Sequence, residues 1–297
     1  MKYAILDIGS NSIRLCVYKA EQDLGFKVLF TKKVMAGLVN YVKGGLMSER
    51  GISRAASVIN EFGELAENVD VSDMHIFATA SFRNIDNTGH VVDEILKMTG
   101  RRVEVLSGYD EAMLGFCGAM ECTSLTKGVM LDTGGGSCEI VLFKDRMAGE
   151  ALSLPIGSLN LYTGFVSDFL PNSREIKNIK KKIDDEFKCV VLERQKAIIG
   201  VGGTIKAFLK VVNYYFKLDK ANRVIKKKQF KEIAEIFESN HRKSREIILK
   251  TCPERVHTII PGMLIFEKVM TITDADEIAV SSYGVREGYL CRNILNR

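Results

Sequence analysis

The chain contains no tryptophan and only four histidines among its 297 residues. The histidines do not have the HExxH spacing of a zinc site, and none of the seven cysteines belongs to a CxxC pair, so neither residue type predicts a transition-metal centre. The longest apolar runs are far shorter than the roughly 18 residues that a membrane span requires. An odd set of unpaired cysteines and an N-terminus that enters a strand pattern at once predict a cytoplasmic protein without a signal peptide.

Several catalytic templates are also missing. The chain has no GxSxG elbow, no Walker A sequence and no kinase HRD motif, which argues against the serine hydrolases, P-loop NTPases and protein kinases that use them. No recognised nucleic-acid-binding motif is present either, so we expect no nucleic acid polymer as a partner and no membrane association.

The charge of the chain is unevenly distributed: the net charge is −2 up to residue 118 and +7 beyond it. The positive excess lies in three stretches in which basic and apolar residues alternate at helical spacing: Lys177–Lys182, Arg223–Lys231 and His241–Lys250. Two interpretations stay open. These stretches are either the solvated faces of amphipathic helices or a basic surface that steers a polyanion.

Two glycine-rich turns dominate what the sequence does contain. One runs from Asp7 to Leu15 and the other from Asp132 to Glu139, and each joins two strand-like runs after a leading aspartate. A turn without bulky side chains lets successive backbone N–H groups approach an anion, and the serine and asparagine side chains add donors. The pattern therefore predicts two phosphate-binding hairpins, although each turn taken alone is also compatible with a purely structural hairpin. The candidate phosphate-binding residues are Gly9, Ser10, Asn11, Ser12, Arg14, Gly134, Gly135, Gly136 and Ser137.

Strand-like and helix-like periodicity alternate along the whole chain, which is typical of an α/β protein. Each half begins with three strands and continues with helices and further strands, so we expect a duplicated domain with a ligand cleft between its copies. We place the first domain at residues 1–118 and the second at 119–297. The expected strands are 3–6, 13–18, 28–34, 75–80, 103–106, 129–131, 139–143, 151–154, 197–201 and 277–280, and the clearest helix is 49–69.

Eight ordered motifs make the chain similar to the exopolyphosphatase/guanosine pentaphosphate phosphohydrolase (Ppx/GppA) family from end to end. They are DIGSNSIRL at Asp7, ATASFRN at Ala78, SGYDEAM at Ser107, LDTGGGSCE at Leu131, SLPIGSLNL at Ser153, GVGGTIKAF at Gly200, IIPGM at Ile259 and SSYGVREGYL at Ser281. The resemblance implies two actin-, Hsp70- and sugar-kinase-like (ribonuclease H-like) domains around a phosphate cleft. It also implies Mg²⁺-dependent hydrolysis of a terminal phosphoanhydride in polyphosphate or guanosine pentaphosphate. The chain resembles the short, two-domain form, whose last helix can pack back on the first domain, and the family commonly forms dimers.

The same resemblance assigns roles to individual residues. Glu111 matches the catalytic glutamate of the family's GxEEARL pattern, and Arg83 matches an arginine beside the cleft. For Glu111, the alternative is a simple first-turn acid that the helix dipole favours. Met113 departs from the pattern because it replaces the usual arginine. Asp132, Glu139 and Asp7 are the candidate Mg²⁺ ligands. Further phosphate contacts are expected at the start of a helix from Gly202, Gly203, Thr204 and Lys206.

The leading hypothesis is a phosphohydrolase that releases terminal phosphate from these substrates. A second hypothesis, motivated by Met113, is a sensor that binds polyphosphate or the nucleotide and hydrolyses it slowly or not at all. A sugar or acetate kinase of the same superfamily is a third hypothesis, but the chain shows no insertion that resembles a sugar-binding loop.

Overall fold

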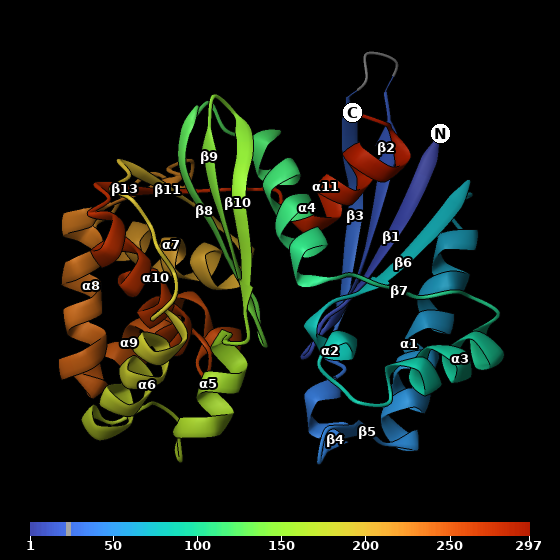
Figure 1. Ribbon diagram of the computed structural model, residues 1–297, viewed down its shortest axis with the longest axis horizontal. Coiled ribbons are helices and arrows are strands. Elements are labelled where there is room, and N and C mark those ends of the chain that lie inside the picture. The colour runs from blue at the N-terminus through green and yellow to red at the C-terminus, as the bar shows by residue number, and fades with distance from the viewer. Residues whose placement is uncertain (22–24) are drawn as a thin grey trace. The chain divides into compact units, whose positions relative to one another are not determined.

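The protein consists of two compact units in a computed structural model that describes residues 1–21 and 25–297 (Figure 1). The first unit contains residues 1–111 and 290–297, and the second contains residues 112–289. The chain passes from one unit to the other inside helix α4 (Gly108–Met120), and again where α11 (Val285–Tyr289) continues into the π-helical turn η3 (Leu290–Ile294). Among the described residues, no helix is both long and apolar enough to cross a membrane.

The expected domain boundary after residue 118 falls inside α4, whereas the contacts divide the chain after Glu111. The reason is the apolar face of α4: Ala112, Phe116 and Ala119 pack with Met130 and residues of neighbouring strands in the second unit. Residues 290–297 group with the first unit, on which the last helix was expected to be able to pack.

The first unit is built on a five-stranded sheet with the order β3-β2-β1-β6-β7. Strands β1, β2 and β3 form an antiparallel meander, and β6 and β7 continue the sheet parallel to β1. The elements of this unit are β1 (Lys2–Ile8), β2 (Ile13–Ala20), β3 (Phe26–Val34), η1 (Leu38–Tyr41), β4 (Val42–Lys43), β5 (Leu46–Met47), α1 (Glu49–Glu67), β6 (Asp73–Ala78), α2 (Ala80–Arg83), α3 (Thr88–Thr99) and β7 (Glu104–Val105).

The second unit repeats this plan in a six-stranded sheet with the order β10-β9-β8-β11-β13-β12. Strands β8, β9 and β10 form the antiparallel meander, β11 and β13 run parallel to β8, and β12 adds an antiparallel edge. Its other elements are β8 (Lys127–Thr133), β9 (Cys138–Lys144), β10 (Met147–Leu154), α5 (Ser158–Phe165), α6 (Ser173–Glu186), β11 (Ala197–Val201), α7 (Gly202–Tyr215), β12 (Val224–Lys226), α8 (Lys227–Ser239), α9 (His241–Thr251), η2 (Pro253–Arg255), α10 (Ile259–Thr273) and β13 (Glu277–Val280). Because five strands share one order and one set of directions in both units, the duplicated α/β architecture of the actin-like fold is confirmed.

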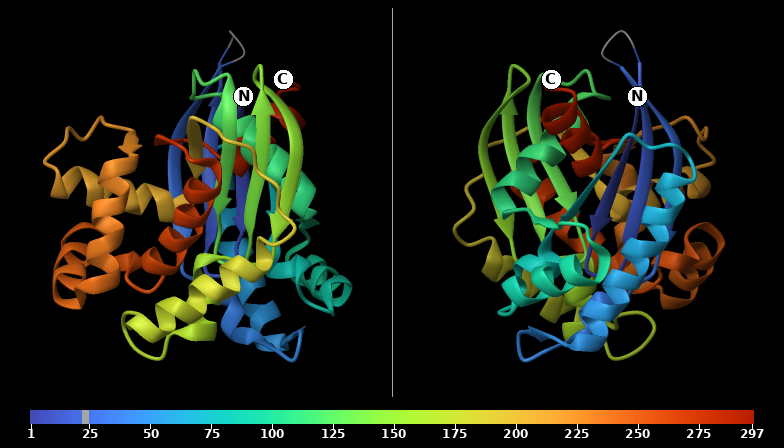
Figure 2. Two further views of the ribbon diagram at one scale, coloured as in Figure 1. Left: turned by 60° about the vertical axis from the view of Figure 1, so that its left-hand side comes forward. Right: turned by 90° about the vertical axis from the view of Figure 1, so that its right-hand side faces the viewer.

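Each core lies between a sheet and the helices that cover it (Figure 2). In the first unit, Leu6 and Leu15 of the sheet pack with Ile59 and Phe62 of α1, all at 0% exposure. In the second sheet, the central strands β8, β9 and β11 are largely buried on both faces. On one face, alternate side chains such as Leu131 pack with the helices from α5 to α10. On the other face, the intervening side chains, such as Met130, pack with α4. This alternation is the strand period of two, and it packs both faces of β8 and β11 against buried side chains.

Candidate active site

The turn after β1 is a tight four-residue loop. Ile8 pairs with Ile13 across the β1–β2 ladder, and the Gly9 N–H donates to the Ser12 carbonyl at 3.1 Å. A Cβ atom on Gly9 would lie 3.2 Å from the same carbonyl oxygen, so a side chain would crowd this turn.

The turn after β8 has the same construction. Thr133 pairs with Cys138, and the Gly134 N–H donates to the Ser137 carbonyl at 3.0 Å. A Cβ atom on Gly134 would again lie 3.2 Å from the carbonyl oxygen that its N–H contacts. The two turns predicted from sequence are therefore equivalent in backbone geometry, one in each unit.

Three carbonyl groups of the first turn and all four of the second accept hydrogen bonds, whereas several N–H groups of both turns donate none within the described residues. In the first turn, the Ser10 carbonyl accepts from Val39 N and the Asn11 carbonyl accepts from Gly37 N. In the second, the carbonyls of Gly134 and Gly135 accept from the first residues of α5. Within the described part of the chain, the N–H groups of Ser10, Asn11, Gly135 and Gly136 donate no hydrogen bond. Successive unbonded N–H groups in a glycine turn form a concavity that suits an anion.

Helix α5 supports the second turn from behind. Ser158 donates to the Gly134 carbonyl from its backbone N at 2.9 Å and from Oγ at 3.0 Å, and Asn160 Nδ2 donates to the Gly136 carbonyl at 3.1 Å. This approach requires glycine at position 157, because a Cβ atom there would lie 2.4 to 2.6 Å from backbone atoms of Gly135 and Gly136. The first N–H groups of α5 are therefore bonded to the turn and are not available to substrate.

Helix α7 begins directly at the end of β11, as the sequence predicts, and its first turn lies beside Asp132. Gly202 has φ of +92°, a conformation that favours glycine, and a Cβ atom there would lie 2.5 Å from Asp132 Oδ1. Two buried hydroxyl groups in this region, Thr133 Oγ1 and Thr204 Oγ1, have no hydrogen-bond partner among the described residues. Since unpaired buried hydroxyls are rare, these two groups and the N-terminus of α7 suit an anionic ligand.

Arg255 is a basic residue of this region that the sequence analysis did not single out. Its partly buried guanidinium packs over the start of α7, where a Cβ atom on Gly203 would lie only 2.1 Å from Arg255 Nη2. Burial lowers the pKa of Arg255 from its ordinary value, and nearby Glu254 opposes this change. In the described ranges the guanidinium has no hydrogen-bond partner. A partly desolvated arginine beside a helix N-terminus is well suited to phosphate oxygens.

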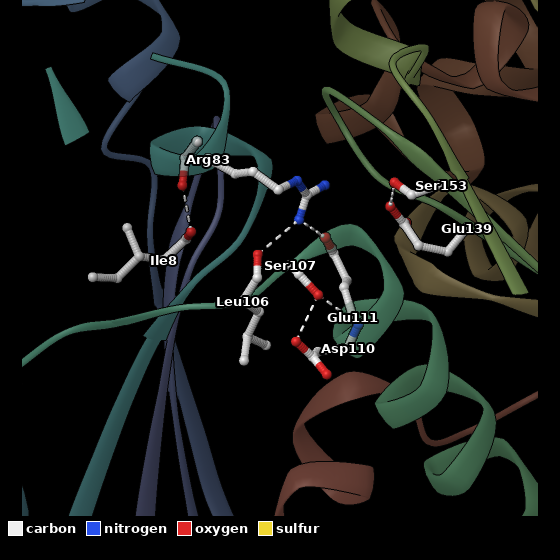
Figure 3. Close-up of polar contacts among 9 residues, drawn as sticks. Ile8, Arg83, Leu106, Ser107, Asp110, Glu111, Glu139 and Ser153 are labelled. Carbon is white, nitrogen blue, oxygen red and sulfur yellow. Dashed lines mark hydrogen bonds and ion pairs between the residues drawn. The ribbon is translucent and has the colours of Figure 1, made fainter. Parts of the chain in front are cut away.

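Glu111 and Arg83, the two predicted catalytic residues, lie together in the first unit (Figure 3). Arg83 Nη1 donates to Glu111 Oε2 at 2.7 Å and to the Leu106 carbonyl at 3.1 Å. The exposed fractions of the two side chains are 19% and 11%, so the pair is largely but not fully removed from solvent. Ser107 caps the N-terminus of α4, since its Oγ accepts from Asp110 N at 3.0 Å, and Glu111 lies in the first helical turn.

The predicted Mg²⁺ ligands are divided between the units, with Asp7 in the first and Asp132 and Glu139 in the second. Asp132 and Glu139 are direct cross-strand partners, and two like charges opposite each other are unfavourable unless a cation or a donor compensates them. Glu139 is 1% exposed and accepts from Ser153 Oγ at 2.8 Å (Figure 3), whereas Asp132 is partly exposed. No group of three or more His, Cys, Asp or Glu side chains in the described ranges could hold a metal by itself.

This arrangement fits Mg²⁺ better than a metal held by protein ligands alone. Mg²⁺ is commonly bound by one or two carboxylates and completes its shell with water and substrate phosphate. Asp132 and Glu139 are the residues of the second unit that meet this requirement.

A family model described as the Ppx/GppA phosphatase family matches residues 16–297. The chain belongs to the Ppx/GppA phosphatase family. Exopolyphosphatase 1 of Mycobacterium leprae is 26% identical over 305 residues, which cover 99% of this chain and 90% of the relative. The solved Ppx/GppA structure from Aquifex aeolicus is also 26% identical, with a TM-score of 0.81 over 100% of this chain and 98% of that one. An exopolyphosphatase structure from Cytophaga hutchinsonii, at 20% identity and a TM-score of 0.86, shares the fold.

One relative is a longer, bifunctional protein, of which this chain matches about half. The bifunctional 3-dehydroquinate synthase/phosphatase of Fusobacterium nucleatum is 26% identical over 317 residues, which cover 99% of this chain but only 47% of that protein.

The remaining predicted residues of this Ppx/GppA chain take several positions. Lys206 donates from Nζ to the Ser282 carbonyl at 2.7 Å, so it holds the segment after β13. Arg14 pairs with Asp7 across the β1–β2 ladder, which places a cation and a carboxylate on the same face at the base of the first turn. Cys138 is not a nucleophile candidate, because burial and the nearby carboxylates Glu139 and Asp132 raise its pKa well above 9.0.

Proposed function

We propose that this Ppx/GppA chain is a Mg²⁺-dependent phosphohydrolase that releases the terminal phosphate of inorganic polyphosphate or guanosine pentaphosphate. The observation that carries the proposal is the pair of equivalent turns, in which most carbonyls are bonded while successive N–H groups have no acceptor among the described residues. A phosphate chain offers many acceptor oxygens to such donors and needs no base-specific pocket. The mycobacterial relative named exopolyphosphatase 1 supports the polyphosphate half of the proposal.

Phosphoryl transfer needs a positioned nucleophile and compensation of negative charge, with little covalent chemistry from the protein. In this proposal, Glu111 orients the attacking water and accepts its proton. The 2.7 Å ion pair with Arg83 fixes the Glu111 carboxylate, so the orientation of the water is set before substrate binds. The N–H groups of both turns, together with Arg255, bind phosphoryl oxygens.

Mg²⁺, when bound, would neutralise part of the charge on the phosphoryl oxygens. Asp132 would be its principal protein ligand, because Asp132 is partly exposed whereas its cross-strand partner Glu139 is only 1% exposed. Cross-strand pairing places the two carboxylates on the same face of the ladder, and a part-buried hydrogen bond from Ser153 holds the Glu139 carboxylate in position.

The test is the release of inorganic phosphate from long polyphosphate, tripolyphosphate and guanosine pentaphosphate by the wild type and by Glu111→Gln. Loss of a general base typically lowers the rate about 10² to 10⁴-fold. Asp110→Asn is the matched control: the residue is exposed, sits next to Glu111 in the same helical turn, and asparagine keeps an oxygen for Ser107. Release that Glu111→Gln loses and Asp110→Asn keeps would support the proposal. Equal release by all three proteins would contradict the role of Glu111.

A second candidate function is a sensor that binds these compounds with little turnover. Met113 favours it, because methionine stands where the family pattern has an arginine, so a cation is missing from this face of α4. The sensor is distinguished by tight binding of tripolyphosphate together with phosphate release that stays at background for every substrate. Restoration of release by Met113→Arg would then identify the missing cation as the cause.

A further inference from the structure

A row of three charged residues crosses the first sheet at the base of the first turn. Cross-strand pairing joins Asp7 of β1 to Arg14 of β2, and Arg14 to Lys33 of β3. Side chains that are paired in this way lie on one face of a sheet, with Cβ atoms about 4.5 to 5.5 Å apart. Arg14 and Lys33 are therefore neighbouring cations, and the single carboxylate of Asp7 compensates only one of them. Neither the pattern of the glycine turn nor the family motifs singled out Lys33.

The row lies on the face of the sheet that is turned away from α1. The residues on either side of Asp7 and Arg14 belong to the core that α1 covers: Leu6, Ile8, Ile13 and Leu15. Next to Lys33, Lys32 donates to Glu61 of α1 at 2.7 Å. Because successive side chains of a strand point to opposite faces, all three charged residues of the row point away from α1.

The unbonded N–H groups of the first turn point to the same side. The carbonyls of Ser10 and Asn11 accept from the segment 37–39, whose middle residue, Leu38, is 0% exposed in the core beside α1. In a trans peptide group the N–H points opposite to the C=O. The N–H groups of Asn11 and Ser12 belong to these two peptide groups, so they point away from α1, and they donate no backbone hydrogen bond among the described residues.

The distances from the turn set the order in which these donors meet a phosphate chain. Arg14 comes two residues after Ser12, about 7 Å further along β2. Lys33 lies one strand spacing beyond Arg14, about 5 Å nearer to the edge of the sheet, because β3 is the edge strand. Arg14 is half-buried and Lys33 is exposed. The row therefore continues the donors of the turn toward the open edge of the sheet.

We propose that Lys33 determines the preferred chain length, because it binds the part of a polyphosphate chain that extends beyond the phosphates held by the first turn and Arg14. This inference rests on the proposed function, and it favours substrates with three or more consecutive phosphates. The N–H groups of the turn and Arg14 satisfy a short anion, whereas Lys33 reaches only the phosphates that follow. A lysine suits this position, since a point charge on a flexible stem accepts phosphate oxygens in more than one orientation.

The experiment compares the affinities of tripolyphosphate and pyrophosphate. Both are measured by calorimetry with Mg²⁺ on the Glu111→Gln background, so that turnover does not interfere. Lys33→Met should weaken tripolyphosphate binding about tenfold, as expected for the loss of one charge-assisted hydrogen bond, and should change pyrophosphate binding by less than about twofold. Lys33→Arg should keep both affinities because the charge remains. The tenfold difference should shrink as the salt concentration rises, because salt screens exposed charges.

Lys27→Met is the matched control. Lys27 is an exposed lysine of the same strand, about 20 Å from Lys33, and its removal should leave both affinities unchanged. Pyrophosphate affinity serves as the folding control for every variant.

The outcomes separate this inference from the proposed function. An unchanged tripolyphosphate affinity in Lys33→Met would overturn the inference and leave the proposed function intact. An equal loss of both ligands would also overturn it, because Lys33 would then not distinguish chain lengths. If the parent protein bound neither ligand and the wild type released no phosphate, the proposed function would be overturned as well.

Discussion

Gly157→Ala is the substitution that tests the architecture of the second glycine turn most directly. Gly157 precedes α5 with φ of −145° and ψ of 172°, an extended conformation that alanine adopts without strain. Its effect therefore comes from the added methyl group alone. That Cβ atom would lie 2.4 Å from the Gly135 carbonyl carbon, 2.5 Å from the Gly135 oxygen and 2.6 Å from Gly136 N, all of them backbone atoms.

Ordinary contacts of a Cβ atom begin near 3.4 Å, so the helix and the turn must separate by about 1 Å. Such a shift weakens the bonds from Ser158, Leu159 and Asn160 to the carbonyls of the turn, which are 2.9 to 3.0 Å long. Each bond contributes about 0.5 to 1.5 kcal/mol, so we expect a loss of roughly 2 to 3 kcal/mol in the free energy of unfolding. A 1 Å displacement of groups that position a substrate typically lowers the rate about 10²-fold.

Gly164→Ala is the matched control because it lies in the same helix, where a Cβ atom meets nothing within 4 Å. Alanine raises the helix propensity there, so this variant should be as stable as the wild type or more stable by up to about 1 kcal/mol. The assays are denaturant unfolding and the kcat/KM for phosphate release from tripolyphosphate with Mg²⁺. If Gly157→Ala matched Gly164→Ala in both assays, the turn would not depend on α5 and the reasoning would be wrong.

Three further predictions concern the same unit. Gly203→Ala displaces the Arg255 guanidinium, because the added Cβ atom would lie 2.1 Å from Arg255 Nη2. The KM for tripolyphosphate should rise about tenfold, while the melting temperature does not fall. An unchanged KM would exclude Arg255 from the site. Asp132→Asn should raise the Mg²⁺ concentration needed for half-maximal release more than Glu139→Gln does, and the reverse order in a Mg²⁺ titration would make Glu139 the principal ligand. Burial first, and then nearby Glu139, raise the pKa of Cys138 well above 9.0 in the folded protein, whereas the unfolded thiol titrates near pH 8.5. The unfolded chain therefore loses this proton first, and the free energy of unfolding should fall above about pH 8.5 by up to about 1.4 kcal/mol per pH unit; Cys138→Ala should lessen that fall in denaturant titrations.

The parts of the fold that the sequence predicts well are those with strong local periodicity. The strand expected at 197–201 coincides with β11, and the expected helix 49–69 is α1 at Glu49–Glu67. The elements that the analysis missed are short, such as β12 (Val224–Lys226) and α2 (Ala80–Arg83). A segment of three or four residues carries too few side chains for a period to emerge, and its structure depends on neighbours that are distant in sequence.

The site residues that the sequence predicts are likewise those that belong to local patterns. The two turns could be predicted because their glycines, serines and leading aspartates are adjacent in sequence. Resemblance to the family singled out Glu111 and Arg83, but their direct contact joins residues that lie 28 positions apart and no local pattern announces it. Arg255 was missed because its special property is its burial beside Gly203, and an arginine in a short polar segment gives no sign of that. The contacts divide the chain after Glu111 and not after residue 118, and the sequence does not reveal which sheet the apolar face of α4 covers.

The two turns have the same backbone geometry but differ in the hydrogen bonds that polarise their peptide groups. In the first turn, the Ser10 and Asn11 carbonyls each accept one backbone bond, from Val39 and Gly37. In the second, the Gly134 carbonyl accepts two bonds from Ser158, and the Gly135 carbonyl accepts two, from Leu159 N and Asn160 N.

These doubly bonded carbonyls belong to the same peptide groups as the N–H groups of Gly135 and Gly136. A carbonyl that accepts hydrogen bonds makes the N–H of its own peptide group a stronger donor, and the positive end of α5 adds to this effect. We therefore expect the second turn to bind more negatively charged phosphoryl oxygens than the first turn does. A helix N-terminus that points at a phosphate turn from behind can strengthen anion binding without touching the anion.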